Sequence, residues 1–118
     1  MQHSYHDISH WTSINLMPFH LNNDGSADGV KEWMVTGVEV GRAYRGQGHA
    51  SRLLSTVVAE ADAEGVTLHL MVAPDGTGLD AEALVAFYSS KGFAHDSDKN
   101  MPDTMTRHPQ SERSVVHA

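Results

Sequence analysis

The sequence predicts a single α+β (mixed α/β) domain, in which helices flank a mixed sheet. Residues 30–40, VKEWMVTGVEV, are rich in the β-branched and aromatic residues typical of strands. Apolar residues recur with a helical period from residue 47 to 64, and residues 66–73 again have a strand pattern. The two strands of such a strand–helix–strand unit are parallel. Further strands expected before and after the unit favour a mixed sheet over a doubly wound one.

The segment before this unit is expected to add one strand and one loop. Residues 8–19 place Trp11, Ile14 and Leu16 among polar residues, an imperfect alternation that predicts a half-buried strand. The stretch NNDGSADG, residues 22–29, consists of turn-forming residues. It therefore predicts a hairpin or a longer loop.

The segment after the unit is expected to add a helix and short strands. Gly65 is placed to end the first helix, and Asp80 is placed to cap a second one that Gly92 ends. The apolar residues of this second helix recur at helical spacing: Leu84, Phe87 and Tyr88. Phe93 and residues 100–107 would supply one or two last strands. We expect one domain over residues 1–107 and a disordered tail over residues 108–118.

Composition excludes several classes of function. The 118 residues contain no cysteine, which rules out a disulfide framework, a thiolate zinc site and a cysteine nucleophile. A net charge of −7 argues against binding to nucleic acid through its phosphates. No apolar run is long enough to span a membrane, and the N-terminus lacks a signal-peptide pattern, so a cytoplasmic location is expected. His3, His6 and His10 lack a metal-binding motif, and we expect no metal there.

Two glycines in the stretch AYRGQGHASRLL, residues 43–54, indicate a phosphate-binding loop before a helix. A P-loop is excluded, because His49 stands where its lysine would follow Gly48. A dinucleotide fingerprint is matched at Gly46 and Gly48 only, with Ser51 in the third place, and too few residues follow for that fold. The third interpretation is a loop with the pattern Arg/Gln-x-x-Gly-x-Gly/Ala, which Arg45, Gly48 and Ala50 fit.

On this pattern the chain resembles the GNAT family of acetyl-coenzyme A-dependent N-acetyltransferases. A second match follows downstream, where FYSSKGF, residues 87–93, is similar to the family's Tyr-x-x-x-Gly-Phe. The chain departs from the family in having Arg42 at a common proline position and Ala81 at a common asparagine position. The resemblance covers residues 30–107 and implies a mostly antiparallel mixed sheet with one splayed parallel strand pair. The region before it is too short for the two helices that the family usually has there.

The resemblance implies acetyl-coenzyme A as co-substrate. Glycines let a backbone approach a pyrophosphate closely, and a helix beginning near Gln47 would direct unpaired amides at it. The backbones of Val38 and Val40 would hold the pantetheine arm, as in the family. Gly37 in mid-strand fits a bulge or a close approach by another backbone. The expected cofactor-binding residues are Val38, Val40, Arg45, Gly46, Gln47, Gly48, His49, Ala50 and Ser51.

The expected reaction is direct attack of a primary amine on the thioester. Tyr88 matches the family's tyrosine and is the expected acid for the departing thiolate. Glu32 is the expected base; the alternative is Glu39, which simple strand alternation would place on the opposite side. The amine can be a small molecule or a protein lysine, and a homodimer would complete a site shortened at its N-terminal side. The alternative class is a non-catalytic coenzyme A-binding or protein-interaction module on the same fold.

Overall fold

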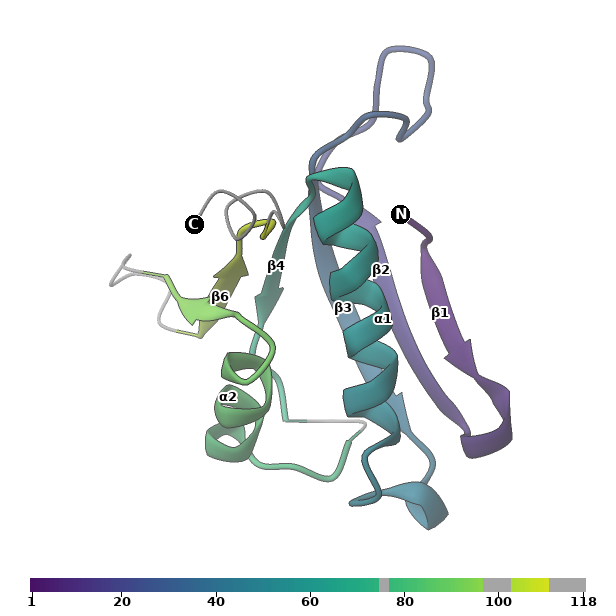
Figure 1. The fold of residues 1–118 in the computed structure, drawn as a ribbon, viewed down its shortest axis with the longest axis vertical. Helices are drawn as coiled ribbons and strands as arrows, with labels where there is room; N and C mark the ends of the chain where they lie inside the picture. The colour runs from purple at the N-terminus through teal and green to yellow at the C-terminus, as the bar shows by residue number, and fades with distance from the viewer. Residues whose placement is uncertain (75–76, 97–102, 111–118) are drawn as a thin grey trace, which may run out of the picture.

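Six strands in the order β1-β2-β3-β4-β6-β5 form one mixed sheet, and two helices pack on it (Figure 1). The computed structural model describes residues 1–74, 77–96 and 103–110. Only the β3–β4 pair is parallel among the described strands; the pairs β1–β2, β2–β3, β4–β6 and β5–β6 are antiparallel. The predicted fold class is therefore confirmed.

The N-terminal segment forms two strands where the sequence predicted one. β1 (Ser4–Asp7) pairs with β2 (Thr12–Pro18), and the short 3-10 helix η1 (Ile8–His10) reverses the chain between them. The reversal is completed by Trp11, which has a left-handed φ of 49°. The prediction that Trp11 is a half-buried strand residue was wrong, since it is 74% exposed.

The central unit has the predicted order. β3 (Glu32–Val40) leads through the 3-10 helix η2 (Arg42–Tyr44) into α1 (His49–Glu64), and β4 (Thr67–Met71) follows. Gly65 ends α1 in a left-handed conformation, as expected. Leu54, Val57 and Ala61 form the buried stripe of α1 that its helical period predicted.

The C-terminal segment contains α2 (Ala81–Ser89), β5 (Ala94–His95) and β6 (Thr104–Arg107). Asp80 caps α2 as predicted, with its carboxylate accepting a hydrogen bond from the Ala83 amide at 2.8 Å. We expected strand structure to begin at residue 100. Residue 103 is not part of a strand, and residues 100–102 lie outside the described part of the chain. Of the expected disordered tail, residues 108–110 continue from β6 and the Gln110 amide donates to Asp62, while 111–118 are not described.

The hydrophobic core lies between the helices and one face of the sheet. It joins residues of α1 and α2 to inward-facing strand residues such as Ile14, Trp33 and Leu70. Neither helix covers the opposite face, which we call the open face. It carries Asn15, Met17, Glu32, Met34, His69, Met71 and Thr106. In the described part of the chain, no helix has the length and apolar character to cross a bilayer.

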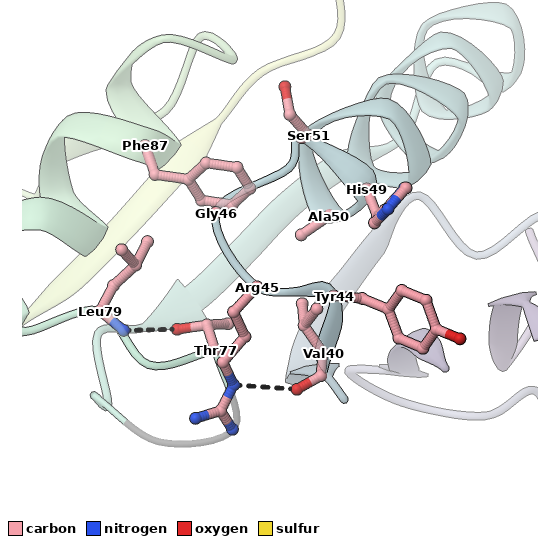
Figure 2. A pocket seen from close by; sticks show the side chains of 11 residues that line it. Val40, Tyr44, Arg45, Gly46, His49, Ala50, Ser51, Thr77, Leu79 and Phe87 are labelled. Carbon is pink, nitrogen blue, oxygen red and sulfur yellow. Dashed lines mark hydrogen bonds between the residues drawn. The ribbon is translucent and has the colours of Figure 1, made fainter. Parts of the chain in front are cut away.

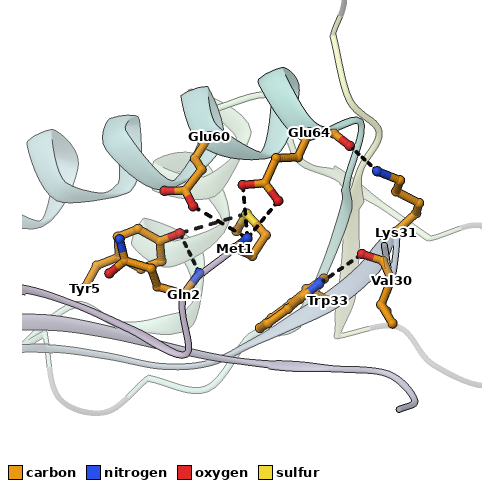
Figure 3. Close-up of polar contacts among 8 residues, drawn as sticks. All are labelled: Met1, Gln2, Tyr5, Val30, Lys31, Trp33, Glu60 and Glu64. Atoms are coloured by element: carbon orange, nitrogen blue, oxygen red, sulfur yellow. Dashed lines mark hydrogen bonds and ion pairs between the residues drawn. The ribbon is translucent and has the colours of Figure 1, made fainter. Parts of the chain in front are cut away.

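The start of the chain lies against the C-terminal half of α1 (Figure 3). The Met1 ammonium group donates to both carboxylate oxygens of Glu64, at 2.7 and 3.0 Å. Lys31 donates to the Glu64 carbonyl at 2.7 Å and fixes the end of the helix to the start of β3. Nearby, burial raises the pKa of Tyr5 to about 12. These contacts hold the edge hairpin against the core.

Candidate functional site

The two parallel strands separate half-way along β3. Their pairing runs from Glu32↔Thr67 to Val35↔Leu70, and β3 then continues for five residues while β4 ends at Met71. A narrow cleft of about 30 Å³ lies at this point. It is lined by Val35, Thr36, Gly37, Val38, Met71, Ala73, Thr77, Leu84 and Tyr88. The geometry exposes one edge of β3 to a ligand that could pair with it as a strand would.

A β-bulge in β3 changes which side chains share a face. Asn15 pairs with Gly37 and Leu16 pairs with Val35, so Thr36 is the extra residue. Beyond it the alternation is reset, and Val38 is buried as Val35 is. Glu39 therefore lies on the same side of the sheet as Glu32, and the expectation that it faces the opposite side was wrong. The bulge lies at Thr36, next to Gly37, where a bulge was one of the two expectations.

The loop before α1 is shaped by two glycines in the left-handed region. Gly46 has a φ of 76° and Gly48 a φ of 86°, conformations that strain other residues. Helix α1 begins at His49, two residues later than expected, because Gly48 still has a non-helical conformation. No side chain caps this end of the helix. The amides of its first turn therefore remain available to an anion, and the helix dipole favours negative charge there.

A pocket of about 160 Å³ lies at the loop and the first turn of α1 (Figure 2). Its lining residues are Val40, Tyr44, Arg45, Gly46, Gly48, His49, Ala50, Ser51, Thr77, Leu79 and Phe87. Thr77 also lines the cleft between β3 and β4, so the two hollows adjoin. Together they form a path from the uncapped helix end to Tyr88, which we call the groove.

Nearly all the expected cofactor-binding residues line this groove; Gln47 does not. The Gln47 side chain donates to the Ala43 carbonyl at 3.1 Å and holds the loop closed. Sequence reasoning missed Tyr44, Thr77, Leu79 and Phe87 as groove residues. Phe87 carried a signal, because it precedes Tyr88 in the quoted motif, whereas Thr77 and Leu79 lie in a loop whose path the sequence does not indicate.

Arg45 fixes the loop to the end of β3. Its Nε donates to the Val40 carbonyl at 3.0 Å, so that oxygen already has a partner (Figure 2). A Cβ on Gly78 would lie 2.9 Å from Cδ of Arg45, which shows how closely the segment after β4 packs on this side chain. The Thr77 hydroxyl accepts from the Leu79 amide at 3.2 Å and shapes the same segment. Arg45 thus connects both walls of the groove.

His49 occupies a partly desolvated position beside the loop. It is 6% exposed, its ring stacks on His10 with centroids 3.7 Å apart, and Arg52 contacts its Nδ1. Burial is the main cause that lowers the pKa of His49, and the charges of His10 and Arg52 add to it. Nδ1 of His10 is hydrogen-bonded to the Asp7 carboxylate at 2.8 Å, so this N-terminal histidine has a fixed partner.

Asp7, His10 and His49 bring one metal-ligating atom each within 4.8 Å of one another. The planes of the two rings differ by only 13°, and the rings are stacked. An ion lies close to the plane of each imidazole that binds it, so one ion cannot lie in both of these planes at once. Arg52 moreover occupies Nδ1 of His49. The cluster as it stands favours hydrogen bonding over metal binding.

Tyr88 belongs to the core and to the groove together. It is 6% exposed, and its ring contacts Phe93 with centroids 5.7 Å apart. It also lines the cleft opposite Val35 and Val38 of β3. Packing in the core fixes the Tyr88 ring on α2. Because Tyr88 also lines the cleft, a ligand between the strands can contact it.

Glu32 lies apart from the groove, on the open face. Its Oε1 is 2.9 Å from Nε2 of His69, a residue of β4 that sequence reasoning missed. The sequence offered only an alternation signal for His69, since it lies between the buried residues Leu68 and Leu70. The pair stands beside the first half of β3, before the strands separate.

Comparison with known proteins agrees with this geometry. No curated protein sequence matches the chain. Solved structures that are similar to it in fold include the following three. The anti-CRISPR protein AcrVA5 is 24% identical, with a TM-score of 0.64 over 89% of this chain and 98% of that one. The ribosomal-protein-S18-alanine N-acetyltransferase from Escherichia coli is 19% identical, with a TM-score of 0.56 over 82% of this chain and 60% of that one.

The third is the GNAT family N-acetyltransferase YhbS from Escherichia coli, solved in complex with coenzyme A. It is 16% identical, with a TM-score of 0.54 over 82% of this chain and 51% of that one. The sequence model of the acetyltransferase (GNAT) family matches residues 14–93, which include most of β2, all of β3, the loop with Gly46 and Gly48, both helices and β4. The chain belongs to the GNAT acetyltransferase family.

Proposed function

We propose that the protein is an N-acetyltransferase that moves the acetyl group of acetyl-coenzyme A to a primary amine. The observation that carries this proposal is the groove, which leads from an uncapped helix end behind two left-handed glycines to a separated strand edge beside Tyr88. A pyrophosphate suits the first end and an amide-bearing arm suits the second. We also propose that the reaction takes place in the cytoplasm.

The groove residues have distinct roles in this proposal. The amides of the first turn of α1, from His49 to Ser51, bind the pyrophosphate, and Gly46 and Gly48 allow it to approach the backbone. The free edge of β3 pairs with the pantetheine arm, chiefly through the backbone of Val38. The Val40 carbonyl already accepts a hydrogen bond from Arg45, so it can bind the pantetheine arm only as an acceptor of a second hydrogen bond. We therefore assign Val40 a role in lining the groove.

The chemistry is a direct acyl transfer. The neutral amine forms a bond to the thioester carbon, the amide of Val38 stabilises the negative oxygen, and the bond from carbon to sulfur breaks. Tyr88 donates its phenolic proton to the departing thiolate, and the surplus proton of the newly bonded nitrogen returns to the Tyr88 oxygen through solvent. An alkylammonium acceptor must first lose a proton, because its pKa is near 10.4 in water. The expected acceptor is a small-molecule amine or a protein lysine.

The first experiment tests the groove and the activity separately. Isothermal titration calorimetry with acetyl-coenzyme A and with coenzyme A should give one site per chain, and NADH should give none. A panel of alkylamines and lysine peptides is then followed by thiol release. Binding with turnover of some amine supports the enzyme. Binding without any turnover favours a non-catalytic coenzyme A module, and absence of coenzyme A binding contradicts both.

A further inference from the structure

A chain of four polar side chains crosses three strands on the open face. Glu32 of β3 contacts Nε2 of His69 at 2.9 Å, and Nδ1 of His69 lies 3.2 Å from the hydroxyl of Thr106 on β6. Thr106 in turn donates to the carboxylate of Asp96 at 2.6 Å. Phe19 stacks on the imidazole with centroids 4.4 Å apart. The ring of His69 is thus held on both nitrogens and on one face.

The chain of hydrogen bonds fixes where protons lie. Hydrogen bonds from Thr104 and Thr106 lower the pKa of Asp96, so its carboxylate is ionised and accepts hydrogen bonds. The one hydroxyl proton of Thr106 therefore lies in the hydrogen bond to Asp96. The Thr106 oxygen can then only accept from His69, which requires a proton on Nδ1. Nε2 and the Glu32 carboxylate would both be acceptors if no further proton were present. One proton must therefore lie between them.

His69 lies near the point where β3 and β4 separate, although neither it nor Glu32 lines the cleft. His69 stands next to Leu70, which forms the last rung with β3 before the strands separate. Met71 is two residues further along β4 and so projects from the same face, about 7 Å from His69 along the strand. Met71 lines the cleft and is 58% exposed. An acceptor that entered over Met71 would pass beside His69.

We propose that His69 and Glu32 act together as the proton acceptor for the attacking ammonium group; this inference rests on the proposed acetyl transfer. The pair first gives its shared proton to solvent, which the half-exposed Glu32 contacts. In that state His69 keeps Nδ1–H on Thr106, and Nε2 and the carboxylate both accept. The acceptor's N–H bond then breaks, its proton passes to Nε2, and the freed lone pair of the amine attacks the thioester carbon. Thr106 and Asp96 are positioning residues that hold the tautomer.

The charges around His69 come from each neighbouring strand. Glu32 faces it from β3, and Asp96 acts through Thr106 from the β5–β6 side, where His95 also lies. The side chains of Met34 and Met71 next to it carry no charge. The proton affinity of the pair therefore depends on the carboxylates of Glu32 and Asp96 and on the imidazole of His95.

The test compares acceptors that differ in charge. His69→Gln and Glu32→Gln should lower kcat/KM by about 10²-fold for an alkylammonium acceptor. Both variants should match the parent with an acceptor of similar shape that is already neutral at pH 7, such as an O-arylalkyl hydroxylamine. His20→Gln changes an exposed loop histidine and is the matched control. An equal loss with both acceptors would mean a structural role and would overturn the proposal.

A second measurement needs no turnover and so separates this inference from the proposed function. Long-range ¹H–¹⁵N spectra of the imidazole rings at neutral pH should show His69 protonated on Nδ1 and sharing a proton at Nε2. In Glu32→Gln the Nε2 proton should be lost while Nδ1–H remains. A parent His69 with a bare Nδ1 would overturn the proton assignment, even if the protein acetylates amines.

Discussion

Gly48 is the residue on which the geometry of the loop most depends. Its φ of 86° sets the direction in which the first turn of α1 presents its amides. Alanine in this conformation costs about 1–2 kcal/mol, and its Cβ would lie 3.1 Å from Nη1 of Arg52. Relief of the strain should rotate the amides, so Gly48→Ala should weaken coenzyme A binding by at least tenfold, about 1.4 kcal/mol.

Gly25→Ala is the matched control for this prediction. Gly25 has nearly the same φ, 83°, but lies in the loop before β3, with no atom within 4 Å of the added Cβ. Both variants should lose similar thermal stability, and only Gly48→Ala should lose affinity in calorimetry. Equal affinities for the two variants would show that the loop does not hold the phosphates.

Tyr88 combines a packing role with the proposed chemical one, and Tyr88→Phe separates them. The change keeps the ring contacts with Phe87 and Phe93 and removes only the hydroxyl. Stability should fall by about 1 kcal/mol at most, through one lost hydrogen bond. If the hydroxyl protonates the thiolate, kcat should fall by about 10²-fold with little change in coenzyme A affinity. Unchanged kcat would remove Tyr88 from the mechanism.

At the residue scale, the sequence predicted the structure best where the backbone conformation restricts which residue can occupy a position. Gly65 ends α1 in the left-handed conformation expected at that position, and Gly46 and Gly48 shape the loop that their spacing indicated. The prediction of which face a strand residue occupies failed where one extra residue resets the alternation, because the bulge at Thr36 moves Glu39 to the face of Glu32. Sequence reasoning also missed His69, because the partner that gives this residue its chemistry is 37 positions away in the chain.

At the element scale, Arg107 joins β6 to both helices. Its guanidinium donates to both carboxylate oxygens of Asp62 on α1, at 2.7 and 3.0 Å. Its Nε donates at 2.7 Å to the carbonyl of Lys91, just beyond α2. Arg107 is 4% exposed, so the pair is largely shielded from water. The contact holds α2, which carries Tyr88, against the rest of the molecule.

Asp62→Asn should therefore destabilise the protein more than a surface change does. It leaves a buried guanidinium without its counter-charge, and we expect a loss of about 3 kcal/mol in urea unfolding. Glu82→Gln, an exposed acid in the first turn of α2, should change stability by less than about 0.5 kcal/mol. The double change Asp62→Leu with Arg107→Met should recover most of the loss, because it leaves no unpaired charge. An Asp62→Asn variant as stable as the parent would contradict the assignment.

Elements with a strong period were predicted from the sequence, and the edge strand β1 was not. Helix α1 combines a regular apolar stripe with Gly65, so both its type and its end could be predicted. Strand β1 has the polar sequence SYHD and one buried residue, Tyr5, and it forms because β2 offers a free edge. Such pairing depends on tertiary structure, which no local pattern contains.

At the scale of the whole molecule, three titrating groups should limit the pH range of stability. Asp62 has a pKa lowered chiefly by Arg107, so its contribution is present above about pH 3.8 and is lost as pH falls through its folded value. His49 has a pKa lowered from 6.5, chiefly by burial. The unfolded chain therefore binds a proton at His49 more readily, and stability falls as pH drops below about 6.5. Burial raises the pKa of Tyr5 from 10.0 to about 12.

The alkaline limit follows from Tyr5 with the opposite sign. Its neutral phenol is favoured in the folded state, so its contribution is complete below pH 10 and is lost between pH 10 and about 12. We expect the melting temperature to be highest between about pH 6.5 and 10. Tyr5→Phe should flatten the alkaline decline, and His49→Gln should flatten the decline below pH 6.5 without changing the alkaline one. Melting temperatures of the parent, Tyr5→Phe and His49→Gln, measured as a function of pH, check the assignment. Profiles that differ only by a constant offset would show that Tyr5 does not set the alkaline limit and that His49 does not set the decline below pH 6.5.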